Sequence, residues 1–131
     1  IARKEGIEIR VNSSRDRIFF YGNRITVMRA LFNLVENSVR YMKRAGEIFI
    51  TIEEMEKAVV LIYRDDGEGM DEKEAEKIGT IGYQGTNHGI SGHGIGMYLV
   101  RQMVEEHGGQ ITIRSGIGKG MSVYMEFPKN L

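Results

Sequence analysis

The residues that most constrain the fold are 47–65, EIFITIEEMEKAVVLIYRD. In the first eight of them, isoleucine occupies every second position (Ile48, Ile50 and Ile52), as expected for a half-buried strand. The run VVLIYRD is rich in β-branched and apolar residues, which is typical of a buried strand, and MEKA forms the turn between the two. The pattern predicts an antiparallel hairpin whose apolar face must be covered by another layer.

Helices that could form this second layer are predicted at 24–43, 71–78 and 94–107. In the two longer ones apolar residues recur three and four positions apart, whereas the short one is highly charged. Glycines follow both longer helices and can end them. The residues expected to face the core are Val27, Met28, Leu31, Leu34 and Val35 in the first helix and Ile95, Leu99, Val100, Met103 and Val104 in the last.

Four further strands extend the sheet. Residues 7–21 are predicted as a hairpin, and two strands at 110–115 and 121–127 flank the turn GIGKG. Helices fall between strand pairs, which predicts a two-layer α/β sandwich (α+β). Its sheet is mixed, mostly antiparallel, of five or more strands, with three helices on one face. Without a repeat or a linker, residues 1–131 form a single domain.

Charge and composition exclude several classes of function. Lys plus Arg and Asp plus Glu both number 18, so the chain lacks the basic surface of a nucleic-acid or anionic-membrane binder. No apolar run approaches 18 residues, and no direct membrane contact is expected. The absence of cysteine fits a cytoplasmic location. The chain begins at Ile1 without a signal peptide, which indicates a fragment of a longer protein.

The first polar segment that could carry chemistry is LFNLVENSVRY, residues 31–41. Asn33 and Asn37 are four residues apart and therefore share a helix face, with Arg40 and Tyr41 one turn further along. One interpretation is a solvated helix face. The other is the lining of a site, in which the Asn37 amide oxygen ligates a hard cation such as Mg²⁺.

The second segment is RDDGEGM, residues 64–70. Asp65 ends a strand and is followed by Gly67 and Gly69, in a turn whose backbone a ligand can approach. A carboxylate in this position could accept a hydrogen bond from an exocyclic amine and so select adenine. The alternative is an ordinary Asx-type turn, because Asp and Gly are common turn residues.

The third segment is GHGIG, residues 92–96, at a predicted helix start. Free N–H groups and the positive end of the helix favour an anion, and glycine lets phosphate oxygens approach the backbone. The segment matches neither the dinucleotide-binding nor the P-loop motif. It lies near the end of a stretch, residues 78–100, that contains no Asp, Glu, Lys or Arg.

With these three segments in this order, the chain resembles the GHKL ATPase superfamily of gyrases, heat-shock chaperones, histidine kinases and mismatch-repair proteins. Within it, the chain looks like the catalytic ATP-binding domain of a sensor histidine kinase. LFNLVENSVRY is similar to the N box, RDDGEGM to the first glycine box and GHGIGMYLV to the second. The C-terminal segment HGGQITIRSGIGKGMSVYMEFP also resembles the closing strands of the family. The resemblance therefore extends from about Gly22 to Pro128.

The resemblance implies that ATP and Mg²⁺ bind here, with Asn37 as the metal ligand and Asp65 as the acceptor for the adenine amino group. Glu36 and Arg40 are the expected catalytic residues, and about 78–94 is the expected ATP lid. The full set of nucleotide-binding residues expected from the three boxes is Asn33, Asn37, Arg40, Tyr41, Asp65, Gly67, Gly69, Met70, Gly92, His93, Gly94, Ile95, Gly96 and Met97.

The implied reaction moves the γ-phosphoryl group to a histidine on a separate dimerisation and phosphoacceptor domain, and then to a response-regulator receiver domain. Asn33 stands where hydrolytic relatives have a glutamate, and because an amide cannot act as a base, phosphotransfer is favoured over hydrolysis. Two alternatives stay open: a regulatory module that binds ATP or ADP without phosphotransfer, and a serine kinase of the anti-sigma type.

Departures from the family pattern affect the lid and the base pocket. Residues 50–126 contain no Phe, the lid has no basic residue, and Met121 replaces a threonine common in relatives. Tyr83 is the candidate substitute for the missing Phe. His88, His93 and His107 match no zinc pattern. His107 is expected at a helix C-terminus, where the dipole favours it.

Overall fold

The computed structural model describes residues 7–15, 18, 22–41, 46–69, 71–77 and 93–129. Within these ranges, the side chains of Arg40, Tyr41, Glu74, His93 and Ile95 and the surroundings of Gly94 are not described. Several predictions fall outside the described residues: most of the second strand of the hairpin at 7–21, most of the lid at 78–94, and Met70 and Gly92 among the site residues.

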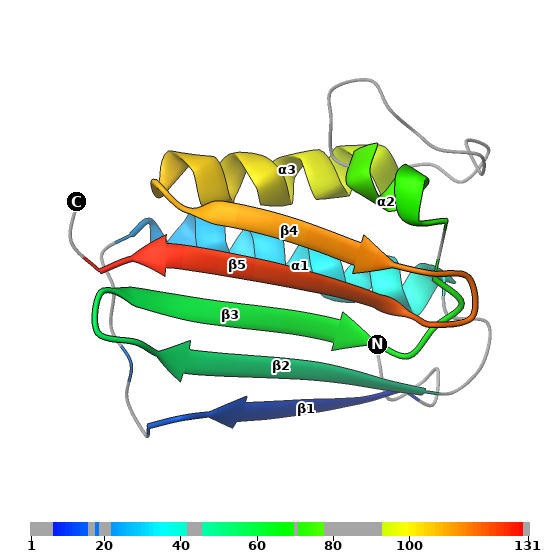
Figure 1. Ribbon diagram of the computed structural model, residues 1–131, viewed down its shortest axis with the longest axis horizontal. Helices are drawn as coiled ribbons and strands as arrows, with labels where there is room; N and C mark the ends of the chain where they lie inside the picture. Colours follow the sequence, from blue (N-terminus) through cyan, green and yellow to red (C-terminus); the bar gives the residue numbers. More distant parts are fainter. Residues whose placement is uncertain are drawn as a thin grey trace.

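Five strands form one sheet, and the helices gather on one of its faces (Figure 1). The strand order is β1-β2-β3-β5-β4, with β1 and β2 parallel and all other pairs antiparallel. The elements are β1 (Ile7–Ser13), α1 (Arg24–Tyr41), β2 (Gly46–Glu54), β3 (Ala58–Asp65), α2 (Glu72–Lys77), α3 (His93–Glu106), β4 (Gln110–Ser115) and β5 (Met121–Pro128). The predicted two-layer sandwich with a mixed, mostly antiparallel sheet is confirmed.

The β2–β3 hairpin lies at the centre of this sheet. Ile50 pairs with Tyr63 and Ile48 with Asp65, so the isoleucine face of β2 continues across β3. The edge strand β1 pairs with β2 in parallel, which a hairpin prediction for 7–21 does not anticipate. The partner predicted for β1 at 17–21 lies, apart from Ile18, outside the described residues.

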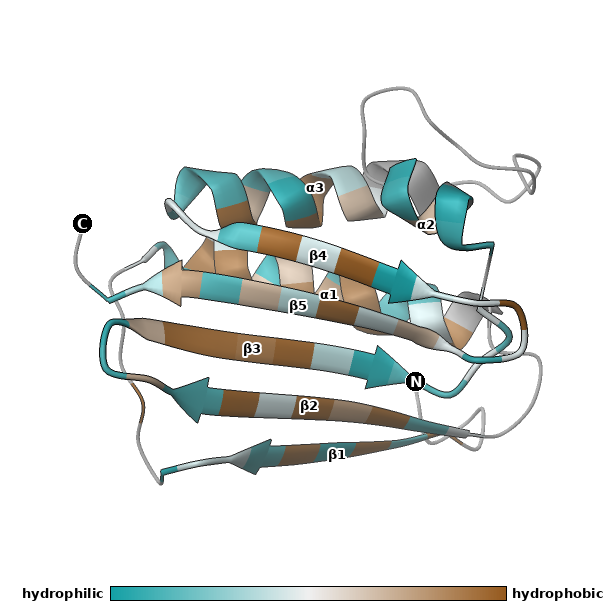
Figure 2. Cartoon of the chain, in the orientation of Figure 1, coloured by the Kyte–Doolittle hydropathy of each residue, from teal (hydrophilic) through white to brown (hydrophobic). Residues whose placement is uncertain are grey.

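Alternation along β3 and β5 separates a core face from an open face. Val59, Leu61, Tyr63 and Asp65 of β3 are buried beneath the helices, and residues of β5 with the same period continue that layer: Met121, Val123, Met125 and Phe127. Figure 2 shows β3 hydrophobic along most of its length and hydrophilic at its C-terminal end. Asp65, the last residue of β3, therefore lies at the edge of the core.

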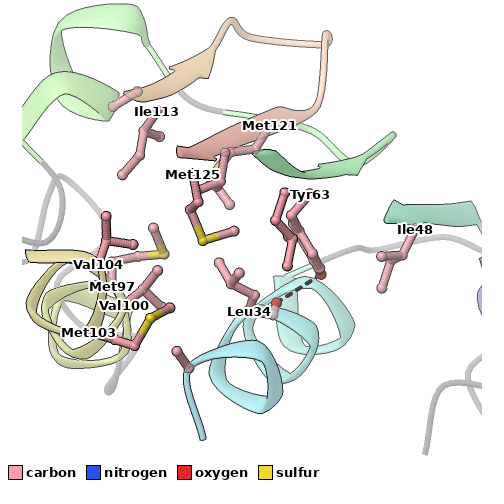
Figure 3. Close-up of a cluster of buried hydrophobic side chains, with 14 of the residues drawn as sticks. Leu34, Ile48, Tyr63, Met97, Val100, Met103, Val104, Ile113, Met121 and Met125 are labelled. Atoms are coloured by element: carbon pink, nitrogen blue, oxygen red, sulfur yellow. Dashed lines mark hydrogen bonds between the residues drawn. The ribbon is translucent and has the colours of Figure 1, made fainter. Parts of the chain in front are cut away.

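The helices close this core from the other side (Figure 3). Leu34 of α1 and four residues of α3 are fully or almost fully buried in it: Met97, Val100, Met103 and Val104. Two predicted core residues are wrong, since Met28 is 62% exposed and Leu99 is 37% exposed. Among the described side chains of α1, the buried ones are instead Ala30, Leu34, Asn37 and Ser38. Two of these four residues are polar, and one of them, Ser38, is hydrogen-bonded to Asp65.

His107 joins the two long helices just beyond the end of α3. Its Nδ1 lies 2.7 Å from the Met103 carbonyl oxygen, and its Nε2 accepts a hydrogen bond from the Asn23 backbone N–H at 2.8 Å. An N–H can only donate, so Nε2 carries no proton and the ring proton sits on Nδ1. The expected position at a helix C-terminus is correct, but the ring acts there as a neutral bridge to the start of α1.

The two faces of α3 should respond differently to truncation. Met103→Ala is expected to lower the free energy of unfolding by about 2–5 kcal/mol, because it opens a cavity in the core. Leu99→Ala, four residues away, should cost less than half as much because that side chain is partly solvated. Urea denaturation of both variants measures the difference, and equal losses would contradict the assigned helix orientation.

Candidate functional site

Several of the predicted site residues lie where the C-terminal end of β3 meets the second half of α1, and Gly96 near the start of α3 packs against the same part of α1. Asp65 is the last residue of β3 and is only 7% exposed. The turn between β4 and β5 lies directly beside it, since the Met121 backbone N–H bonds to the Asp65 carboxylate at 3.2 Å. The geometry therefore gathers one carboxylate, one helix face and one glycine-rich turn.

The Asp65 carboxylate is held from three directions. Its Oδ1 accepts hydrogen bonds from the backbone N–H groups of Gly67 at 3.0 Å and Met121 at 3.2 Å. Its Oδ2 accepts a hydrogen bond from the Ser38 hydroxyl at 2.8 Å. A carboxylate has about four acceptor positions, so these contacts leave one, on Oδ2, for a further donor.

Glycines allow the turn after β3 and the β4–β5 turn to interlock. A Cβ on Gly120 would lie 2.1 Å from the Asp65 carbonyl oxygen, and Gly120 has a φ of 73°. Gly69, with a φ of 72°, would place a Cβ 2.3 Å from the Gly116 carbonyl oxygen. Neither position can accept a side chain without displacing backbone. The need for glycine at Gly69 is thus explained by the protein's own packing.

The polar face of α1 is buried rather than solvated. Asn37 is 6% exposed, and the Nδ2 atoms of Asn33 and Asn37 both lack a hydrogen-bond partner in the described part of the chain. A buried donor without a partner costs about 1–3 kcal/mol. For Asn37 this excludes the alternative of a solvated helix face, and it leaves two donors on one helix that suit oxygen acceptors.

Gly96 brings the second glycine segment against this face. A Cβ at Gly96 would lie 3.2 Å from Asn37 Nδ2 and 3.5 Å from Asn37 Oδ1, so the α3 backbone directly abuts the amide. Glycine at this position therefore allows α3 to pack closely against the Asn37 amide. In this way residues 59 positions apart in the sequence, Asn37 and Gly96, become part of one site.

The remaining predicted residues divide into three groups. Glu36 is exposed on α1, next to Asn37. Met97 is fully buried in the core, so its side chain contributes packing. Arg40, Tyr41, His93, Gly94 and Ile95 lie within helices, but their side-chain surroundings, like the whole of Met70 and Gly92, are outside the described residues.

Sequence reasoning missed Ser38 and Tyr63. The Tyr63 hydroxyl lies 2.6 Å from the Ser38 Oγ. It also lies 2.9 Å from the Leu34 carbonyl oxygen, the contact drawn in Figure 3. Burial raises the pKa of the Tyr63 phenol well above its usual value, so the group remains a hydrogen-bond donor. The period of two in β3 already puts Tyr63 on the face of Asp65, but nothing local indicates that Ser38 reaches them.

The chain is similar to several known proteins. Residues 22–131 match the family model of histidine kinase-, DNA gyrase B- and HSP90-like ATPases. The sensor protein SrrB of Staphylococcus aureus is 30% identical over 127 residues, which are 95% of this chain but only 22% of SrrB. The chain therefore spans about a fifth of that relative's length.

Solved structures of histidine kinases share the fold. The nucleotide-free catalytic domain of the histidine kinase ThkA matches with a TM-score of 0.84 and 26% identity, covering 98% of this chain and 84% of that one. ThkA in complex with the response regulator protein TrrA matches with a TM-score of 0.77 over 98% of this chain and 36% of that one. Among the described helices, none is both long and apolar enough to cross a membrane.

The interlocked turns predict unequal effects of two neighbouring glycines. Gly118→Ala should cost about 1 kcal/mol of unfolding free energy, since its φ is 79° but no atom lies within 4 Å of the added Cβ. Gly120→Ala should cost at least about twice as much, because its methyl group meets the Asp65 backbone. Thermal or urea denaturation tests this pair, and a Gly120→Ala variant as stable as Gly118→Ala would contradict the packing.

Proposed function

Because the chain belongs to the family of histidine kinase-, DNA gyrase B- and HSP90-like ATPases, we propose that it is the catalytic domain of a sensor histidine kinase. It binds Mg-ATP and donates the γ-phosphoryl group to a histidine on a separate dimerisation and phosphoacceptor domain. The observation that supports this most directly is the buried Asp65 carboxylate with one open acceptor position, bonded to α1 through Ser38, together with the unpartnered Nδ2 atoms of Asn33 and Asn37 on the same helix.

The donors and acceptors of the site fit a nucleotide. The open position on Asp65 Oδ2 suits the amino group of adenine, while the unpartnered Nδ2 groups of Asn33 and Asn37 suit oxygen acceptors such as phosphates. Gly96, without a side chain, lets α3 pack against the Asn37 amide without displacing it. The helix α3 starts at His93, and the N–H groups and positive dipole end of a helix start suit phosphate oxygens.

Asn37 also fits a role as a magnesium ligand. Its amide oxygen is a hard, neutral ligand, and Mg²⁺ is commonly held by one or two protein oxygens together with substrate phosphates and waters. No group of three or more His, Cys, Asp or Glu residues that could hold a metal occurs among the described residues. When bound, Mg²⁺ would neutralise phosphate charge.

Other residues receive roles in the proposal from their place in the sequence. Arg40 contributes a cation near the phosphates, and Tyr41 an aromatic surface for the nucleotide. Glu36, exposed beside Asn37, orients the acceptor histidine or a water. Gly92, His93, Gly94 and Ile95 line the phosphate end, with Met70 closing the base end and residues 78–94 acting as the lid.

The partners follow from the same proposal. They are ATP and ADP, the dimerisation and phosphoacceptor domain of the same protein, and the receiver domain of a response regulator. The complex of ThkA with TrrA supports the last of these, because a kinase with the same fold meets a response regulator there. A cytoplasmic location follows for the domain, since ATP and receiver domains are found there.

The reaction is tested on a version of the protein that includes the phosphoacceptor domain. After incubation with γ-labelled ATP, the kinase proposal expects a phosphoprotein that is acid-labile and base-stable, as a phosphohistidine is. An acid-stable phosphoprotein would point to a serine kinase of the anti-sigma type. Nucleotide binding without any phosphoprotein would favour a regulatory module, a possibility raised by the lack of Lys and Arg in 78–100.

Asn37 should couple nucleotide affinity to magnesium. Asn37→Ala is expected to weaken binding of a non-hydrolysable ATP analogue at least about tenfold in Mg²⁺, and to abolish most of the difference between Mg²⁺ and EDTA. Isothermal titration calorimetry measures both. Arg29→Ala, exposed on the same helix, is the matched control and should bind like the parent. Unchanged affinity in Asn37→Ala would remove Asn37 from the site.

A further inference from the structure

We propose that Ser38 determines base specificity by positioning the carboxylate of Asp65. Its hydroxyl orients the carboxylate so that a single acceptor position, on Oδ2, faces the 6-amino group of adenine. The inference rests on the proposed function, since it concerns the selectivity of the same nucleotide site. Ser38 acts through Asp65 and is therefore a positioning residue.

The two oxygens of the Asp65 carboxylate are held from different layers of the fold. Both donors to Oδ1 come from the sheet side: Gly67 from the turn after β3, and Met121 from β5. With these alone, the carboxylate would be anchored through one oxygen, and its plane could turn about that anchor. Ser38, at 2.8 Å from Oδ2, is the contact that comes from the helix layer and fixes the second oxygen.

The hydroxyl of Ser38 is itself oriented. Ser38 has one hydroxyl hydrogen, and when it points to Asp65 Oδ2, the 2.6 Å contact with Tyr63 needs the tyrosine as donor. The single phenolic hydrogen of Tyr63 is then shared between Ser38 Oγ and the Leu34 carbonyl oxygen at 2.9 Å. Such a chain of hydrogen bonds directs each donor towards the carboxylate and strengthens the next one.

Burial makes this series of hydrogen bonds rigid. Ser38 is 3% exposed and Tyr63 is fully buried, so water does not compete for either hydroxyl. The Met121 side chain is apolar, and only its backbone N–H reaches Asp65. Within the described part of the chain, Ser38 is thus the one hydroxyl group in contact with the Asp65 carboxylate.

The chemistry of the remaining position distinguishes purines. An ionised carboxylate oxygen accepts hydrogen bonds and cannot donate one. The amino group of adenine can donate to it, the keto oxygen of hypoxanthine would oppose it, and unsubstituted purine offers no donor at all. If Ser38 holds Oδ2 in place, its loss should weaken ATP specifically and leave purines without the amino group nearly unchanged.

The test uses this chain of 131 residues and calorimetry with non-hydrolysable triphosphates of adenosine, inosine and purine riboside. The parent should prefer the adenosine analogue. Ser38→Ala should weaken that analogue about 5- to 10-fold, the effect of impairing one charge-assisted hydrogen bond, and the purine riboside analogue less than about 2-fold. Ser38→Thr, which retains the hydroxyl, should recover most of the preference.

Two further variants separate positioning from stability. Tyr63→Phe keeps the ring in the core but releases the Ser38 hydroxyl, and should reduce the adenosine preference in the same direction by about 2- to 3-fold. Met103→Ala lowers stability at a distance from the chain of hydroxyls and should leave the preference unchanged.

The outcomes separate this inference from the function on which it rests. A folded Ser38→Ala variant with the parent's preference, or one that weakens all three analogues equally, would overturn the role of Ser38. If Ser38→Ala does not fold, an unchanged preference in Tyr63→Phe would overturn it as well. Failure of the parent to bind any of the three analogues would instead count against the proposed function.

Discussion

The site depends on the hydrogen bonds that hold one buried carboxylate, Asp65, between the two layers of the sandwich. The sheet contributes two backbone N–H donors, from Gly67 and Met121, and the helix layer contributes the Ser38 hydroxyl. A buried charge is costly unless it is bonded in this way. The same bonds that make burial possible also leave one acceptor position on Oδ2, so the proposed recognition of adenine uses contacts that already stabilise the buried carboxylate.

Helix α1 combines two tasks on a single stripe. Ala30 and Leu34 pack into the core, and one turn later Asn37 and Ser38 continue the stripe as polar residues. Ser38 finds partners within the protein, whereas Asn37 keeps a buried amide donor without one. The buried stripe of the helix therefore changes from apolar to polar along its length, and Gly96 on α3 packs against the amide of Asn37.

The sequence predicts the elements better than their orientations. The strands at 47–65 and the helices follow from periodicity, since side-chain patterns of two and 3.6 residues are local properties. Met28 and Leu99 were assigned to the core because they are apolar and correctly spaced, yet both are exposed. Which flank of a helix is buried depends on its rotation against the sheet, and that rotation is set by contacts between elements far apart in the sequence. The parallel β1–β2 pairing is likewise a long-range contact that no local pattern contains.

For the site, the sequence alone determined the chemical groups and their order: two amides on one helix face, an acid after a strand, and glycines at a helix start. These are properties of residue type and spacing. Only the tertiary structure decided that Asn37 is buried against Gly96, that Gly69 and Gly120 serve the packing of two turns, and that Ser38 and Tyr63 complete the surroundings of Asp65. Hydrogen bonds between residues 25 to 56 positions apart depend on how the layers pack, and that information appears only once the chain has folded.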